Sequence, residues 1–142
     1  MEYTLARPMA YTGTRPTKKE WVGPAMTALT VLFLIFDIAI KFTANDAVVS
    51  AFGELGYPIS LAAVISTLEA LCCLIYLVPR TSILGALLLT GYLGGAIASH
   101  VRIGSPLFTH ILFPIYVALL IWGGLVLRDA DLRAFVRRRI RE

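Results

Sequence analysis

Apolar residues along the chain form four long stretches separated by short polar segments. The stretches cover about residues 22–40, 59–78, 82–101 and 107–127. Each is close to the roughly 20 apolar residues that a helix needs to cross the ~30 Å hydrocarbon layer of a bilayer. The pattern therefore predicts an all-α polytopic membrane protein whose transmembrane domain occupies residues 22–127.

The links between the stretches are short, which limits how the helices connect. Only Pro79, Arg80 and Thr81 separate the second stretch from the third, and residues 102–106 separate the third from the fourth. Links of this length join neighbouring antiparallel helices. We therefore expect an antiparallel four-helix bundle.

Two segments outside these stretches have amphipathic patterns of their own. Residues 45–55 repeat apolar positions at helical spacing, with Asn45 or Asp46 available as a cap and Gly56 as a stop. We expect a short external helix there, lying on the membrane. Residues 128–142 combine an apolar stripe with a run of arginines, which favours a helix on the anionic inner leaflet. A solvated basic tail that only enforces topology fits the same arginines equally well.

Charge distribution predicts the orientation of the chain. The chain has 13 Lys and Arg against 9 Asp and Glu. Eleven of the 13 precede residue 22, follow residue 127 or sit in the link at Arg80, and two lie on the opposite side. The positive-inside rule therefore places both termini in the cytoplasm, with residues 1–21 as a cytoplasmic tail. The residues expected at the membrane surface are Lys41, Arg80, Arg102, Arg128, Arg137, Arg138 and Arg139.

Composition narrows the class of protein further. Hydrophobic residues make up 58% of the chain and charged residues 15%, and the mean hydropathy is +0.77. These values exclude a disordered chain and a nucleic-acid-binding domain. The first twenty residues are polar, so we expect no cleaved signal peptide. Cys72 and Cys73 are adjacent in an apolar run and are expected to be inert packing residues.

One ionisable residue falls deep inside a predicted span. Glu69 is the eleventh residue of the second stretch, near the middle of the bilayer. A charge there costs at least about 2.5 kcal/mol, so Glu69 is expected to face the bundle interior. Two interpretations stay open. Glu69 is either a functional acid for binding or proton exchange, or a protonated carboxyl that ties helices together through Ser66, Tyr92 or a backbone carbonyl.

Other polar residues gather at the outer side of the predicted bundle. Asp37 and Lys41 form an i, i+4 pair, and Arg102 follows the third span. The predicted ligand-binding set is Asp37, Glu69, Tyr92, His100 and His110, which together describe a funnel from the outside. Interfacial anchoring also accounts for the Asp37 and Lys41 pair and for Arg102. Two histidines without a third ligand are too few for a metal site, so none is expected.

Small residues on the third span predict a packing surface. Gly91, Gly95 and Ser99 are spaced four residues apart, and this spacing lets two helix backbones approach closely. We expect this surface to pack within the chain, although a second copy would use the same spacing.

Several runs of sequence resemble a known family. They are Gly56-Tyr57-Pro58, Leu68-Glu69, Val78-Pro79-Arg80-Thr81, the glycine-rich residues 85–96, His100-Val101-Arg102 and Leu127-Arg128-Asp129. Together they resemble the DoxX-like family. The resemblance implies a four-helix integral protein of the bacterial inner membrane. Some relatives are associated with thiosulfate or quinone redox chemistry and with oxidative-stress complexes.

Three functions fit these observations. The first is a non-catalytic membrane protein that binds a small amphipathic molecule, such as a quinone or a lipid, in an outward-opening polar pocket. The second is an accessory or assembly subunit that docks partner membrane proteins, including a membrane oxidoreductase. The third is a small proton-coupled transporter, which lacks the support of an inverted repeat. No catalytic motif or cofactor signature favours an enzyme.

Overall fold

A computed structural model describes residues 21–141, and in this range the chain is helical with no β-strand. The helices are α1 (Val22–Thr43), α2 (Asp46–Glu54), α3 (Leu61–Leu77), α4 (Ser82–Arg102), a short π-helix η2 (Leu107–Ile111), α5 (Phe113–Arg128) and α6 (Ala130–Arg141). Residues 1–20 of the predicted cytoplasmic tail, and Glu142, lie outside the described residues.

Three stretches are long and apolar enough to cross a membrane. They are α1, α4 and the continuous segment Leu107–Arg128. The predicted span 59–78 is shorter in the structure, because α3 has only 17 residues. A turn around Pro58 delays its start, with the amide of Leu61 donating to the carbonyl of Pro58 at 3.0 Å.

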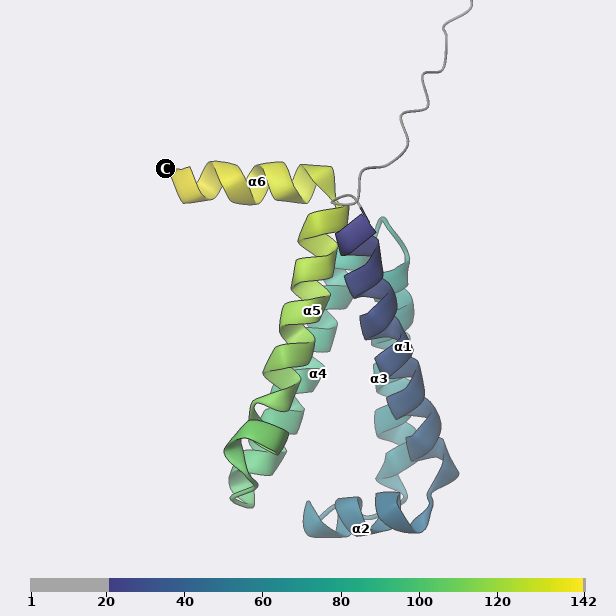
Figure 1. Cartoon of the computed structure of the whole chain (residues 1–142). Coiled ribbons are helices and arrows are strands. Elements are labelled where there is room, and N and C mark those ends of the chain that lie inside the picture. The colour runs from purple at the N-terminus through teal and green to yellow at the C-terminus, as the bar shows by residue number, and fades with distance from the viewer. Residues whose placement is uncertain (1–20, 142) are drawn as a thin grey trace, which may run out of the picture.

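The four long helices contact one another in a ring. α1 packs against α3 and α5, and α4 packs against the same two helices. Figure 1 shows α6 crossing one end of this group and α2 crossing the other. The four helices converge near α6 and spread apart toward α2 (Figure 1).

Glycines allow the helices to touch at the α6 end. A Cβ atom added to Gly85 of α4 would lie 2.2 Å from the backbone nitrogen of Tyr76 on α3. A Cβ atom on Gly23 of α1 would lie 2.7 Å from the backbone nitrogen of Arg128, and Gly124 of α5 meets α1 in the same way. Backbone therefore packs directly on backbone at this end, as small residues permit in membrane helices.

A buried core joins the same helices. Its members come from α1, α3, α4 and α5: Leu34, Cys72, Cys73, Tyr76, Ala86, Leu89, Leu93, Val117, Ile121 and Leu125. The two cysteines are free thiols within this core. The hydroxyl of Tyr76 donates to the carbonyl of Ile121 at 3.0 Å, so this fully buried polar group has a partner.

The outer faces of the long helices carry large apolar side chains. Leu29, Phe36, Leu74 and Leu119 are each more than half exposed in the isolated chain. A surface this apolar is typical of helices that meet lipid.

The α2 helix packs on the protein rather than lying only on the membrane as expected. Val48 and Phe52 are buried in a second cluster with Ala62 of α3. The side chain of Asn45 accepts a hydrogen bond from the amide of Val48 at 3.0 Å, which caps the start of the helix. Part of the apolar face of α2 therefore packs on α3.

The prediction that Gly91 and Gly95 pack within the chain is wrong. No atom of another described helix lies within 4 Å of a Cβ atom added to either glycine. The helix α4 instead contacts its neighbours through the face that carries Gly85, Leu89 and Leu93. At 100° per residue the two glycines lie on the opposite face, which is open in this chain.

Replacing Gly85 with alanine should lower the stability of the fold. The added methyl group would meet the backbone of α3, and overpacking of this kind costs about 1–3 kcal/mol. We expect a lower melting temperature for Gly85→Ala in mild detergent. Gly94→Ala is the matched control on the open face of the same helix, where it should leave the melting temperature unchanged or slightly raised. Equal melting temperatures for the two variants would show that the close approach is not rigid.

Candidate functional site

A buried network of charged and hydroxyl groups joins three helices at the α2 end. Its centre is the ammonium of Lys41 on α1, which donates to Oε2 of Glu69 on α3 at 2.9 Å and to the hydroxyl of Tyr92 on α4 at 2.8 Å. Lys41 also pairs with Asp37 one turn earlier on α1. The Tyr92 hydroxyl in turn donates to Oε2 of Glu69 at 2.9 Å.

Helix geometry and side-chain length bring these groups together. Asp37 and Lys41 are four residues apart and so share one face of α1. The long aliphatic stem of lysine lets its ammonium reach inward to Glu69, although its backbone lies in the last turn of α1. The chain then turns sharply at Ala44, which adopts a left-handed conformation and leads into α2.

Burial makes this network costly to break. The side chain of Glu69 is 1% exposed, that of Lys41 16% and that of Asp37 31%. Charges removed from water must be paired, because an unpaired buried charge is strongly destabilising. Two carboxylates share one ammonium here, and Oε1 of Glu69 has no hydrogen-bond partner among the described residues.

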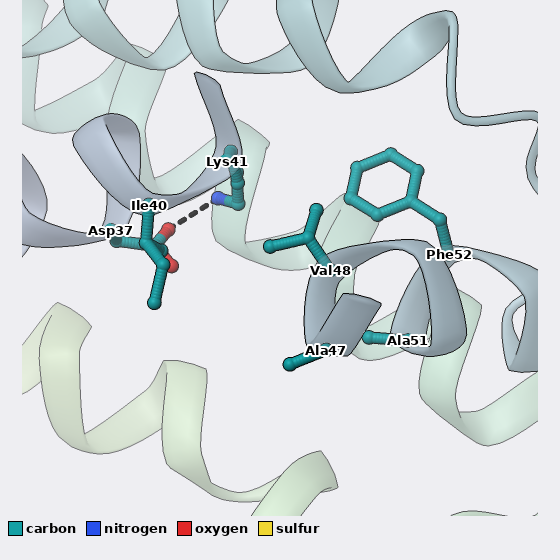
Figure 2. Close-up of a pocket in the computed structure, with 7 residues that line it drawn as sticks. All are labelled: Asp37, Ile40, Lys41, Ala47, Val48, Ala51 and Phe52. Carbon is teal, nitrogen blue, oxygen red and sulfur yellow. Dashed lines mark hydrogen bonds and ion pairs between the residues drawn. The ribbon is translucent and has the colours of Figure 1, made fainter. Parts of the chain in front are cut away.

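A pocket of about 210 Å³ opens beside the network, between α1 and α2. Figure 2 shows the charged pair of Asp37 and Lys41 on one side and α2 residues on the other. The apolar lining consists of Ile40, Ala47, Val48, Ala51 and Phe52. The arrangement of a polar end and an apolar wall is typical of sites for small amphipathic molecules.

The two predicted histidines form a separate pair. The rings of His100 and His110 lie edge to face with centroids 5.2 Å apart. Nδ1 of His100 is 3.0 Å from the hydroxyl of Ser105, and Nδ1 of His110 is 2.8 Å from that of Thr109. Neither histidine lines the pocket or bonds to the network within residues 21–141. The structure therefore brings together Asp37, Glu69 and Tyr92 of the predicted set, but not the histidines.

Arg102 forms a clamp between the end of α4 and the loop after α2. Its guanidinium donates to the carbonyl of Leu55 and lies 5.9 Å from the ring centroid of Tyr57. The Tyr57 hydroxyl lies 2.9 Å from that of Ser99, also on α4. Gly56 between them has φ of 71°, a conformation that favours glycine. Arg102, which was expected at the membrane surface, ties α4 to the segment that follows α2.

The comparison with protein families decides what kind of protein carries this site. The model of the DoxX-like family matches residues 25–124, well over half of the 142-residue chain. The chain belongs to the DoxX-like family. Comparison with curated proteins and with solved structures finds no match.

The part of this DoxX-like protein that matches the family contains the whole network and the pocket. Residues 25–124 include α2, α3 and α4, and both segments joined by the Arg102 clamp. The basic helix α6 lies outside the matched range. The region that matches the DoxX-like family therefore contains the candidate site, and α6 follows this region.

Lys41 is the residue of this DoxX-like site whose contact with Glu69 was not predicted. It was expected at the membrane surface, and it is the cation that pairs with Glu69. The signal was present, because an acid inside a membrane requires a partner. Within residues 22–127 the cations are Lys41, Arg80 and Arg102, and Arg80 is on the opposite side of the predicted bundle.

The other predicted surface residues of the DoxX-like chain, Arg80, Arg128, Arg137, Arg138 and Arg139, make no hydrogen bond to the network. Arg80 is exposed in the link between α3 and α4, and Arg137, Arg138 and Arg139 are exposed on α6. Arg128 donates to the carbonyl of Tyr76 at 3.2 Å and stacks over its ring. Within residues 21–141 no group of three or more His, Cys, Asp or Glu side chains is arranged to hold a metal ion. The chemistry open to the network is the binding of a proton, a cation or a hydrogen-bonding ligand.

Removing the Lys41 ammonium should destabilise the protein strongly. Lys41→Met leaves two carboxylates without their cation, which should lower the free energy of unfolding by about 3 kcal/mol. Adding Glu69→Gln removes one of these charges and should recover part of the loss. Unfolding by SDS titration in mixed micelles measures both effects.

Arg80→Met serves as the control for loss of a positive charge. Arg80 is exposed at the other end of the bundle, so its replacement should change stability by less than about 0.5 kcal/mol. If Lys41→Met proves as harmless as Arg80→Met, the network does not hold the helices together.

Proposed function

We propose that this protein is an antiparallel four-helix bundle of the bacterial inner membrane, with both termini in the cytoplasm. The charge distribution supports this orientation, because eleven of the 13 Lys and Arg precede residue 22, follow residue 127 or lie in the link at Arg80, and the other two lie at the α2 end. Those two, Lys41 and Arg102, are used in contacts within the chain. The pocket then opens outward, and α6 lies along the inner membrane surface, across the helix ends (Figure 1).

We further propose that the protein binds a small amphipathic molecule, such as a lipid or a quinone, and does not itself catalyse a reaction. The observation that carries this proposal is the pocket between α1 and α2, with its charged pair at one side and an apolar wall at the other. The buried oxygen Oε1 of Glu69 adds support, because it has no hydrogen-bond partner within residues 21–141 and a bound ligand or water would supply one.

A role as an accessory or assembly subunit is the second candidate. It is favoured by the open face of α4, where a Cβ atom added to Gly91, Gly94 or Gly95 would meet no other helix of residues 21–141 within 4 Å. Small residues of this kind let a helix of another membrane protein, or of a second copy, approach closely. Co-purification in mild detergent, with Gly91→Leu as the variant that blocks the face, distinguishes this role from ligand binding.

The orientation predicts a clear result with reporter fusions. An alkaline phosphatase domain fused after Glu142 should be inactive in a bacterial host, and a fluorescent reporter at the same site should be active, because α6 faces the cytoplasm. The opposite pattern would turn the pocket inward and refute the proposed orientation.

Filling the pocket should abolish ligand binding. We expect at least one of three probes, 4-phenylbutan-1-ol, 4-phenylbutylamine and a short-chain ubiquinone, to raise the melting temperature of the wild-type protein. Ala47→Trp places an indole in the pocket and should remove this shift. Ser50→Trp on the same helix is the control, because Ser50 is exposed and does not line the pocket. Binding by none of the probes, or binding that survives Ala47→Trp, would contradict the proposal.

A further inference from the structure

The hydrogen-bond donors at the polar end of the pocket are all in use. The ammonium of Lys41 has three N–H groups, and they meet acceptors on Asp37, Glu69 and Tyr92. The hydroxyl proton of Tyr92 is given to Glu69. A ligand that only accepts hydrogen bonds, such as a quinone, therefore finds no free side-chain donor in this network.

In contrast, two hydrogen-bond acceptors of the network have no partner among the described residues. One oxygen of Asp37 pairs with Lys41, and the other has no hydrogen bond to a described residue, while the side chain is 31% exposed beside the pocket. Oε1 of Glu69 is buried and also lacks a partner within residues 21–141. Two carboxylates against one ammonium leave a net charge of −1 when all three groups are ionised. A ligand that donates hydrogen bonds and carries a positive charge would bind the unpaired acceptors and also neutralise the net negative charge.

The start of α2 does not supply an alternative site for an anion. The free amides at a helix N-terminus attract negative charge, and Ala47 and Val48 of this turn line the pocket. Here, however, the Asn45 side chain already accepts the Val48 amide, and Asp46 adds a carboxylate in the first turn. The positive end of the helix is therefore already compensated.

The charges around the pocket are mostly negative, as is the surplus charge of the network. The α2 end carries four carboxylates and two cations among the described residues: Asp37, Asp46, Glu54 and Glu69 against Lys41 and Arg102. The Arg102 guanidinium is bound to the Leu55 carbonyl and does not line the pocket. A surplus of negative charge raises the local concentration of cations and speeds their association.

The apolar wall limits the size of the ligand. The pocket volume is about 210 Å³, and a dry cavity of roughly 150 Å³ holds a benzene molecule. One ring on a short chain therefore fits. Its apolar part can lie against Val48, Ala51 and Phe52 while its polar head faces Asp37 (Figure 2).

We propose that the pocket selects a small amphipathic amine, whose ammonium donates to the free oxygen of Asp37 and balances the surplus carboxylate of the network. The inference rests on the proposed function, because it names the class of ligand that the same pocket takes. The pocket is then expected to bind cations in preference to quinones.

Three probes that share one skeleton test the selection. They are 4-phenylbutylamine, 4-phenylbutan-1-ol and 4-phenylbutyrate, which at about pH 7 are a cation, a neutral molecule and an anion. Binding is measured by calorimetry to the full chain in phosphatidylcholine nanodiscs, with empty nanodiscs subtracted for partition into lipid. We expect the amine to bind about tenfold more tightly than the alcohol, the effect of one charge-assisted hydrogen bond, and the anion to bind most weakly.

Two variants test whether Asp37 causes the preference for the amine over the alcohol. Asp37→Asn should abolish the tenfold preference for the amine over the alcohol. Asp46→Asn removes the same charge from outside the pocket lining and should keep most of it. The ratio of the two affinities in the wild-type protein decides the proposal by itself, so the test does not depend on Asp37→Asn folding.

The outcomes separate this inference from the function on which it rests. If the alcohol, the anion or a short-chain ubiquinone binds as tightly as the amine and Ala47→Trp blocks that binding, the pocket stands and the selection for cations is refuted. If no probe binds, or if Ala47→Trp leaves binding intact, the pocket itself is refuted. Weaker amine binding in nanodiscs that contain phosphatidylethanolamine would assign the ammonium to a lipid headgroup, and unchanged binding would assign it to a free amine.

Discussion

The ammonium of Lys41 is the point on which the α2 end of the molecule depends. It is bonded to groups on α1, α3 and α4, and no other cation reaches the buried Glu69 in the described part of the chain. A carboxylate in a membrane interior is tolerated only when it is paired, protonated or hydrated. Lys41 lies in the last turn of α1, close to the end of the helix at Thr43. That end in turn sets where α2 begins and where the pocket lies.

The two ends of the helix group are held together by different forces. At the α6 end, Gly23, Gly85 and Gly124 let backbones touch, so dispersion contacts between closely packed atoms dominate. At the α2 end, Val48 and Phe52 pack on Ala62, and the Lys41 network and the Arg102 clamp add polar contacts between the helices. Close backbone packing leaves little room for a ligand, whereas a polar network with unused acceptors leaves binding capacity. The candidate site accordingly lies at the polar end.

Much of the helix pattern follows from hydropathy, but the contacts between helices do not. Apolar stretches predicted the long helices, and Asn45 was one of two residues proposed as the cap of α2. Depth along a helix predicted that Glu69 faces inward, which its burial agrees with. The reach of Lys41 was missed, because rise per residue locates a backbone and not the end of a four-carbon side chain. The open face of α4 was missed because spacing shows that glycines share a face and not what that face meets.

The short length of α3 has a consequence for the surrounding lipid. At about 1.5 Å per residue its 17 residues span roughly 25 Å, against ~33 Å for the 22 residues of α1. In the proposed membrane arrangement, α3 is shorter than a ~30 Å hydrocarbon layer, and the bilayer would have to thin locally to relieve this hydrophobic mismatch. Because α3 begins just after the loop that holds α2, the deformation falls next to the pocket. A change in bilayer thickness would therefore alter the geometry of the site without any change to its residues.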